Sequence, residues 1–167
     1  MIGPAKIVVR YANGKTLKGY SQDFSPTSPH FHVRPNEAAG SDPGQQVSLR
    51  DLKAVFFVRN FSGDDSYEER KTFVAGKALS GKKIEVTFKD GEVLVGTTTG
   101  YDAQRPGFFL FPADDKTNNT RTFVVAVAVK NVRFLWLYPH FVLIHDVTPG
   151  CGDPKPSAAE SQRSGSA

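Results

Sequence analysis

The chain is poor in cysteine and has no long apolar run. Its single cysteine, Cys151, leaves no partner for an intrachain disulfide and excludes a zinc site built on cysteines. No segment approaches the ~20 apolar residues that a transmembrane helix requires. The first ten residues, MIGPAKIVVR, lack a charged leader followed by an apolar core and a cleavage site. We therefore expect neither a secretory signal nor a membrane span, and the expected location is cytoplasmic.

A strong excess of one charge is also missing. The 167 residues carry 21 basic and 17 acidic side chains, which gives a net charge of +4. A nucleic-acid partner needs positive charge concentrated on one face, so this mild excess permits such a partner without arguing for it. The apolar fraction of 39% excludes wholesale disorder. At ~100–200 residues per domain, the length predicts one domain or two small ones.

The common motifs of catalysis are absent as well. The chain has no Gly-x-Ser-x-Gly elbow, no phosphate-binding glycine loop followed by Lys-Ser or Lys-Thr, and no His-Glu-x-x-His. Two pairs of neighbouring acids, Asp64-Asp65 and Asp114-Asp115, stand in polar stretches, where we expect solvated turns rather than acid–base pairs. We predict that the protein is not an enzyme and uses no cofactor.

Two histidines have the spacing of metal ligands. His30 and His32 are two residues apart, which places both imidazoles on one face of a strand. A metal site needs a third ligand, which His140, His145 or an acid would have to supply through the fold. We therefore expect ordinary surface histidines and no metal.

What the chain does contain is an internal repeat. A shift of 77 residues superimposes turn glycines and core positions with no gap. The matching residues are Ile7, Val9, Gly14, Leu17, Gly19, Pro29, Phe31 and Pro35 on Ile84, Val86, Gly91, Leu94, Gly96, Pro106, Phe108 and Pro112. Chance agreement at both kinds of position is improbable, so we interpret the chain as two copies of one module.

Each copy has the pattern of a β structure. Alternation of apolar and other residues with period two, broken by turn residues, predicts five short strands in each copy. In the first copy they are Lys6–Ala12, Leu17–Phe24, Phe31–Arg34, Val47–Leu49 and Ala54–Val58. In the second they are Lys83–Lys89, Val93–Tyr101, Phe108–Phe111, Phe123–Ala128 and Val132–Leu137. Five short, bent strands in so few residues predict a small barrel.

Turn and strand glycines recur in both copies. Asn13-Gly14 and Asp90-Gly91 follow the first strand of each copy and predict hairpins with type I′ turns. A glycine inside the second strand, Gly19 or Gly96, indicates a bend, a bulge or a close backbone approach.

These patterns divide the chain into four parts. The predicted domains are copy 1 over 3–58, a linker over 59–80, copy 2 with an extra C-terminal strand over 81–147, and a disordered tail over 148–167. The linker is polar, with acids before bases, which fits a short helix and a solvated connection equally well.

Aromatic residues are numerous for two small barrels. Phe56 and Phe57 are consecutive, as are Phe108 and Phe109, and neighbouring strand side chains face opposite sides. One residue of each pair must therefore pack outside its own core. We favour packing between the copies over an exposed protein-binding or stacking surface. The residues of the exposed alternative are Phe56, Phe109 and Trp136.

The segment IEVTFKDGEVLVGTTTGYD of the second copy resembles the first signature of the Sm-like (LSm) small-barrel family. The pattern is an alternating strand followed by Asp90-Gly91, Leu94, Gly96 and Asp102, and the first copy carries Ser25 in place of the last aspartate. The resemblance implies an all-β fold of two tandem five-stranded Sm-like or SH3-like barrels. Residues 3–137 as a whole also resemble an uncharacterised bacterial domain family found beside signalling modules, with no established activity.

Sm-like proteins bind single-stranded RNA, but the residues of their base pocket do not match here. Arg105-Pro106 stands where the family has histidine or methionine followed by asparagine, so the resemblance implies the fold more than the function. Basic residues at the repeated corners and last strands could still contact a single-stranded nucleic acid. They are Lys53, Arg105, Lys130 and Arg133. Lysines that protect a barrel edge explain them equally well.

The leading expectation is a non-enzymatic binding or interaction module of a bacterial cytosolic regulatory system. Its partner would be an unidentified protein or a second copy of the chain, and no membrane. The alternative is a single-stranded nucleic-acid (RNA) binding protein of Sm-like type. Binding that weakens steeply with salt would favour the alternative, because phosphate contacts release counterions.

Overall fold

The protein is all-β. The computed structural model describes residues 3–37, 42–64, 66–74, 80–135 and 144–147, and these contain strands and two short 3-10 turns. The strands of the first copy are β1 (Ala5–Tyr11), β2 (Thr16–Ser21), β3 (His30–Val33), β4 (Gln45–Ser48) and β5 (Leu52–Val58). Those that follow are β6 (Lys82–Phe88), β7 (Val93–Thr98), β8 (Gly107–Pro112), β9 (Asn119–Val125), β10 (Val129–Leu135) and β11 (Ile144–Val147). The turns are η1 (Leu49–Asp51) and η2 (Ala126–Ala128).

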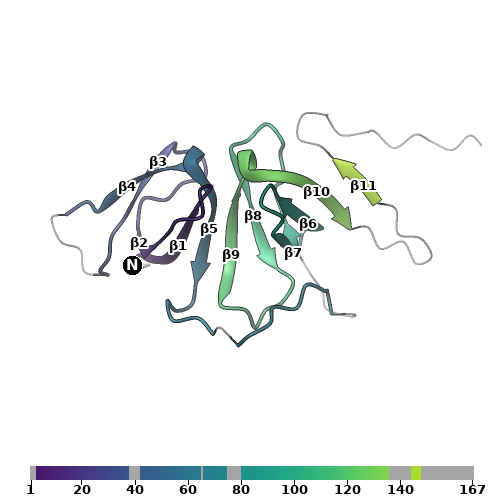
Figure 1. The fold of residues 1–167 in the computed structure, drawn as a ribbon, viewed down its shortest axis with the longest axis horizontal. Coiled ribbons are helices and arrows are strands. Elements are labelled where there is room, and N and C mark those ends of the chain that lie inside the picture. Colours follow the sequence, from purple (N-terminus) through teal and green to yellow (C-terminus); the bar gives the residue numbers. More distant parts are fainter. Residues whose placement is uncertain (1–2, 38–41, 65, 75–79, 136–143, 148–167) are drawn as a thin grey trace, which may run out of the picture.

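The strands form two open sheets. One has nine strands in the order β11-β10-β6-β7-β8-β9-β5-β1-β2, and the other consists of β3 and β4. A single bridge, Tyr20 opposite Arg34, connects β2 to the chain just after β3. Figure 1 shows the first copy on the left and the second on the right, with β5 and β9 side by side between them.

The 77-residue offset relates the strand pairs of the two copies residue by residue. Corresponding pairs are Ile7 opposite Gly19 and Ile84 opposite Gly96, Val9 opposite Val55 and Val86 opposite Val132, and Phe31 opposite Val47 and Phe108 opposite Val124. The bulge near the start of β5 recurs near the start of β10, and η2 follows η1 by the same offset. The two copies therefore share one pairing scheme.

The hairpin turns differ from the expected type I′ geometry. Gly14 and Gly91 have φ of 87° and 90°, and no described residue other than glycine has a positive φ. A type I′ turn would require Asn13 and Asp90 to adopt positive φ too. Tyr11 N donates to Lys15 O and Gly14 N donates to Tyr11 O, as in a three-residue loop that ends in a left-handed glycine.

The strand glycines mark close approaches of two backbones, one of the predicted alternatives. A Cβ on Gly19 would lie 2.3 Å from the carbonyl oxygen of Arg34, and a Cβ on Gly96 would lie 2.1 Å from that of Phe111. Both distances are far shorter than a van der Waals contact, so only glycine allows the second and third strands of each copy to meet.

The two hydrophobic cores each borrow residues from the other copy. The core around Ile84, Val86 and Phe88 includes Phe56 of β5. The core around Ile7, Val9 and Phe31 includes Phe123 of β9. The prediction of two closed barrels is not met, because the outer edge of β9 pairs with β5 of the first copy instead of closing its own copy. The predicted domain boundaries stay a prediction.

The described part of the connection between the copies contains no helix. It is anchored by the buried Asp114 carboxylate, which accepts hydrogen bonds from the Tyr67 hydroxyl at 2.5 Å and from Arg70 N at 3.0 Å. Asn118 Nδ2 also donates to Asn60 O at 2.9 Å. Both ends of the stretch from Asn60 to Arg70 are thus bound to the loop between β8 and β9.

At the C-terminal side, β11 pairs antiparallel with β10. Of the predicted extra strand, Ile144 and His145 belong to β11, whereas 138–143, Trp136 and the predicted tail over 148–167 lie outside the described residues. Within the described part of the chain, no helix has the length and apolarity to cross a membrane.

Candidate interaction site

The contact between the copies accounts for the consecutive aromatics. Phe57 packs in the core of the first copy and Phe56 in that of the second, because successive β5 side chains face opposite sides. Phe108 and Phe109 divide in the same way. Phe56 and Phe109 thus pack against the other copy, as the preferred interpretation expects of one residue in each pair, whereas Phe57 and Phe108 pack in the cores of their own copies. Phe56, only 6% exposed, therefore belongs to the internal contact and not to an external surface.

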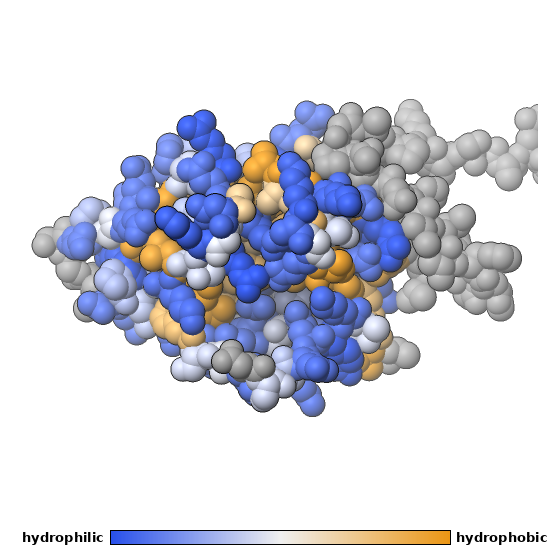
Figure 2. All heavy atoms as spheres, in the orientation of Figure 1, coloured by the Kyte–Doolittle hydropathy of each residue, from blue (hydrophilic) through white to orange (hydrophobic). Residues whose placement is uncertain are grey.

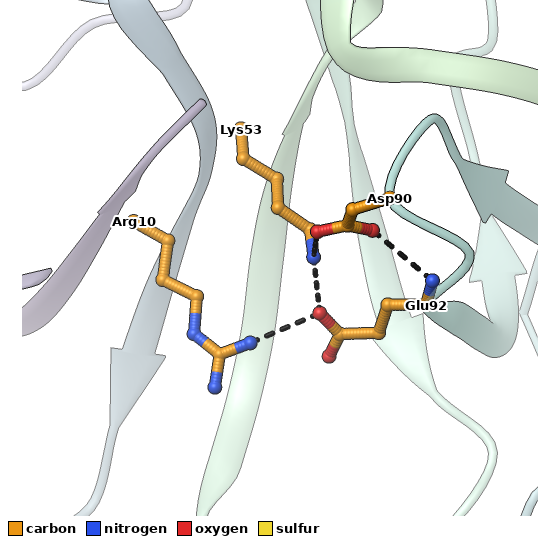
Figure 3. A network of polar contacts seen from close by, with 4 residues as sticks. All are labelled: Arg10, Lys53, Asp90 and Glu92. Atoms are coloured by element: carbon orange, nitrogen blue, oxygen red, sulfur yellow. Dashed lines mark hydrogen bonds and ion pairs between the residues drawn. The ribbon is translucent and has the colours of Figure 1, made fainter. Parts of the chain in front are cut away.

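Lys53 is the central polar residue of this contact (Figure 3). It is the bulged residue of β5, it is 6% exposed, and its ammonium lies 4.6 Å from the centre of the Phe88 ring. The Lys53 ammonium donates to the carboxylates of Asp90 and Glu92, which flank Gly91 in the β6–β7 hairpin. Glu92 also accepts from Arg10 at 2.9 Å. A lysine enclosed by two acids is not available to a phosphate.

This network affects the protonation of the hairpin. The Lys53 ammonium beside Asp90 holds the pKa of that carboxyl below its ordinary value, and the Glu92 backbone N–H, which also donates to Asp90, adds to the effect. Asp90 therefore stays ionised under mildly acidic conditions, and the ion pair with Lys53 persists there.

The other predicted nucleic-acid contacts do not gather around Lys53. Arg133 pairs with Glu85 at 2.9 Å, and the exposed Arg105 pairs with Asp102 at 3.3 Å. Lys130, the counterpart of Lys53 on β10, is exposed. Three of the four predicted residues are thus paired with acids, and only Lys130 has no ion pair with a described residue.

Asp114 departs from the expected solvated turn. It is 1% exposed, and three donors hold its pKa well below the ordinary value, the Tyr67 hydroxyl first and then the backbone N–H groups of Arg70 and Lys116. Asp64 caps its own turn by accepting from Ser66 N at 3.0 Å. Each carboxylate thus accepts the backbone N–H two residues further along the chain, that of Ser66 for Asp64 and that of Lys116 for Asp114.

The predicted histidine pair also has a local explanation. His32 donates its backbone N–H to Asp23 at 2.9 Å, and its Nδ1 lies 2.7 Å from the other oxygen of the same carboxylate. His30 is exposed at the start of β3. The described residues contain no group of three or more side chains that could hold a metal ion.

A cleft of about 570 Å³ opens along one side of the contact between the copies. Its lining includes the apolar side chains Val8, Val58 and Leu94 and both charge signs, among them Arg59 and Glu69. Burial raises the pKa of Glu69. Figure 2 shows that hydrophilic residues dominate the visible face, with hydrophobic residues between them. The mixed charge of the cleft does not select a polyanion.

A second hollow, of about 710 Å³, lies on the outer side of the first copy. We call it the first-copy socket; its lining includes Tyr11, Asn13, Lys15, Gln45, Arg50 and Asp51. By the 77-residue offset, Tyr11, Asn13 and Lys15 correspond to Phe88, Asp90 and Glu92, the residues around Lys53. The socket is therefore the counterpart of the Lys53 site.

The socket adjoins a strand with an available edge. β9 pairs with β8 on one side and with β5 on the other, whereas β4, its counterpart, pairs with β3 alone among the described residues. The edge and the socket together occupy, on the outside of the first copy, the positions of the surface that the second copy offers to β5, with different side chains. Sequence reasoning missed this site, although the charge change from Asp90 and Glu92 to Asn13 and Lys15 was visible in the repeat.

Comparison with known families places most of the chain in a family whose function has not been established. The family of unknown function DUF6982 matches residues 3–136. No curated protein and no solved structure matches the chain.

Proposed function

Because the chain belongs to this family of unknown function, we propose its role from the structure: a non-enzymatic interaction module that binds an extended segment of a partner protein along the outer edge of β4. We assign it to a bacterial cytoplasmic regulatory system. Main-chain hydrogen bonds along an exposed edge supply affinity in this mode of recognition, and neighbouring side-chain pockets supply specificity.

One observation carries the proposal. The counterpart of β4 already binds a strand in this way, since β9 pairs with β5 over Val55 opposite Phe123 and Phe56 opposite Thr122. On β4 the corresponding residues are Gln46 and Gln45, both exposed. An edge with the same backbone pairing scheme and with exposed, polar side chains suits a partner protein that binds reversibly.

We retain the Sm-like relationship of each copy as part of the proposal, supported by the shared pairing scheme and the Asp90-Gly91 hairpin. The single-stranded RNA alternative has less support. Lys53 is enclosed between Asp90 and Glu92, and the remaining predicted contacts do not form one basic surface with it. A phosphate-binding face needs several unneutralised cations together.

Selection of random peptides displayed on phage against the full chain tests the proposal. Selected peptides should shift the NMR amide signals of Gln45–Ser48, and binding should be lost when the peptide is N-methylated at every second residue. N-methylation of the alternate set should leave binding intact, because only one set of N–H groups faces a neighbouring strand.

A separate titration tests the rival function, binding of single-stranded RNA. Labelled oligouridylate should show no binding, or only weak binding, at about 50 and 200 mM salt. Peptide signals confined to other strands, or RNA affinity that falls about tenfold or more between these salts, would contradict the proposed function.

A further inference from the structure

The first-copy socket and its counterpart, the site around Lys53 in the second copy, differ in charge. In the second copy, the site around the Lys53 ammonium carries the carboxylates of Asp90 and Glu92. In the first copy, the same hairpin positions are Asn13 and Lys15. The site that accepts a cation in one copy has thus lost both acids and gained a lysine in the other.

A second cation adds to this change. Arg50 lines the first-copy socket, and its counterpart in the second copy is Val127. Lys15 and Arg50 are both exposed and form no ion pair with a described residue. Asp51 is the one acid in the lining, and its counterpart is Ala128. Ala12, which also lines the socket, corresponds to Lys89, so the charged lining changes from two acids and one base in the second copy to one acid and two bases in the first.

The hydroxyl of Tyr11 provides a further polar group. Tyr11 lines the socket at the position of Phe88, whose ring lies under Lys53. Burial first, and the nearby Asp51 second, raise the pKa of Tyr11, so its hydroxyl remains a hydrogen-bond donor at neutral pH. Phenol, ammonium and guanidinium groups are all donors that suit a carboxylate.

A second copy of this chain does not fit the site. The strand that corresponds to β5 is β10, which carries Lys130 at the Lys53 position and would bring a cation toward Lys15 and Arg50. The outer edge of β10 is moreover paired with β11. Like charges that meet at a contact suppress the wrong partner.

We propose that the first-copy socket binds an aspartate or glutamate side chain of a partner protein whose extended segment pairs with β4. The acidic residue occupies the place that Lys53 has in the second copy, one position before the strand pairing begins. This inference rests on the proposed function and adds the chemistry of the partner: an extended segment with an acid at one defined position, and not a second copy of this chain.

A pair of peptides tests the charge directly. Both copy Asp51–Val58, the segment that contains β5, with threonine at the positions of Phe56 and Phe57 to keep them in solution. One has glutamate and the other lysine at the position of Lys53. By fluorescence anisotropy, the glutamate peptide should bind the full chain about tenfold more tightly than the lysine peptide.

Protein variants locate the effect. The double variant Lys15→Glu with Arg50→Glu should reverse the preference, so that the lysine peptide binds more tightly. The control Lys130→Glu with Arg105→Glu changes the net charge equally on exposed residues outside the socket and should leave the preference unchanged.

The outcomes separate the two proposals. Equal affinity of both peptides, with NMR shifts at β4, would overturn the acidic partner and leave the proposed function standing. Failure of both peptides to bind would overturn both, because a strand with the sequence pattern of β5 would then not add to the counterpart of β9.

A variant series in the second copy provides an independent measurement. Asp90→Asn with Glu92→Lys installs the first-copy residues around Lys53 and should lower the urea midpoint of unfolding. Adding Lys53→Glu should recover most of the loss. A triple variant no more stable than the double variant would show that this hairpin does not accept an acid, and would overturn the inference.

Discussion

The faces that join the two copies and their counterparts on the outside of the molecule have the same backbone pairing but different side chains. On β5, Ala54 and Phe56 face the second copy and are buried; on β10 their counterparts are Asn131 and Arg133. The reciprocal face shows the same change. Phe109, Phe123 and Val125 pack against the first copy, and their counterparts are His32, Gln46 and Ser48.

This difference shows why the contact between the two copies is not repeated on their outer faces. Repeated modules expose an apolar face at each end unless the terminal faces are polar. Here both outer faces have lost most of their apolar side chains, and β11 pairs with β10 in the place that β9 takes on β5. Of the two strands that correspond to the joined pair β5 and β9, β10 is paired with β11, whereas β4 pairs with β3 alone among the described residues, which is why we place the binding site on the outer edge of β4.

The largest loss of stability should come from a substitution that makes the face joining the two copies resemble its counterpart on the outside of the molecule. Phe123→Gln places the first-copy residue Gln46 at a position that is 0% exposed. Loss of the buried ring and burial of an amide should cost about 3–5 kcal/mol of unfolding free energy. Urea denaturation measures this loss. The control Gln46→Ala, on the exposed counterpart, should change stability by less than about 0.5 kcal/mol; equal effects would contradict the comparison.

The next largest loss of stability is expected at Asp114, which anchors the segment that connects the two copies. Asp114→Asn removes a buried, fully hydrogen-bonded carboxylate and should cost about 2–3 kcal/mol at neutral pH. Because donors hold the pKa of Asp114 below its ordinary value, its contribution is present above the unfolded pKa of about 3.9 and is lost as pH falls below it.

The stability of the wild type should therefore fall more steeply between pH 5 and pH 3 than that of Asp114→Asn, as urea titrations at the two pH values will show. Glu37, the counterpart of Asp114, is exposed, so Glu37→Gln should keep the wild-type pH dependence. Parallel pH profiles for the wild type and Asp114→Asn would disprove the assigned role.

A smaller effect is expected at Lys53. Lys53→Met keeps the aliphatic packing on Phe88 but leaves Asp90 and Glu92, which are 54% and 33% exposed, without their cation. Solvent access to both acids limits the cost to about 1–2 kcal/mol of unfolding free energy. Lys130→Met on the outer face should have no measurable effect on the urea midpoint. A loss of stability equal to that of Lys53→Met would contradict this expectation, because it would require an equivalent ion-pair network around Lys130.

The smallest effect should follow removal of an outer ion pair. Arg133 and Glu85 are 32% and 25% exposed, and Arg133→Ala should cost less than about 1 kcal/mol. Phe56→Ala, at the counterpart position inside the contact, should cost about 3 kcal/mol or more. Thermal unfolding of the two variants compares them, and a ranking in the other order would mean that the outer face is buried in solution.

Much of the local structure follows from the sequence. All ten strands expected in the two copies are present, because alternation and turn glycines are local signals. Gly19 and Gly96 mark the backbone contacts that one of the predicted alternatives required. The type I′ turns were wrong, since Asn-Gly and Asp-Gly also suit a three-residue loop in which only the glycine has positive φ.

The site was harder to predict, because charge alone does not indicate exposure. Lys53 and Lys130 occupy equivalent positions, yet one is enclosed by acids from a hairpin 37 residues away and the other is exposed. Asp114 likewise lies in a polar stretch, and only the arrival of Tyr67 and Arg70 makes its burial favourable.

The sequence by itself determined the strands and the repeat, because these depend on period-two patterns and on glycine geometry within short segments. The tertiary structure alone decided that β9 pairs with β5, that Lys53 is internal, and that the edge of β4 lies beside a basic socket. Strand edges are chemically alike, so the pairing of edges depends on which side chains meet across the whole molecule, and no local pattern encodes it.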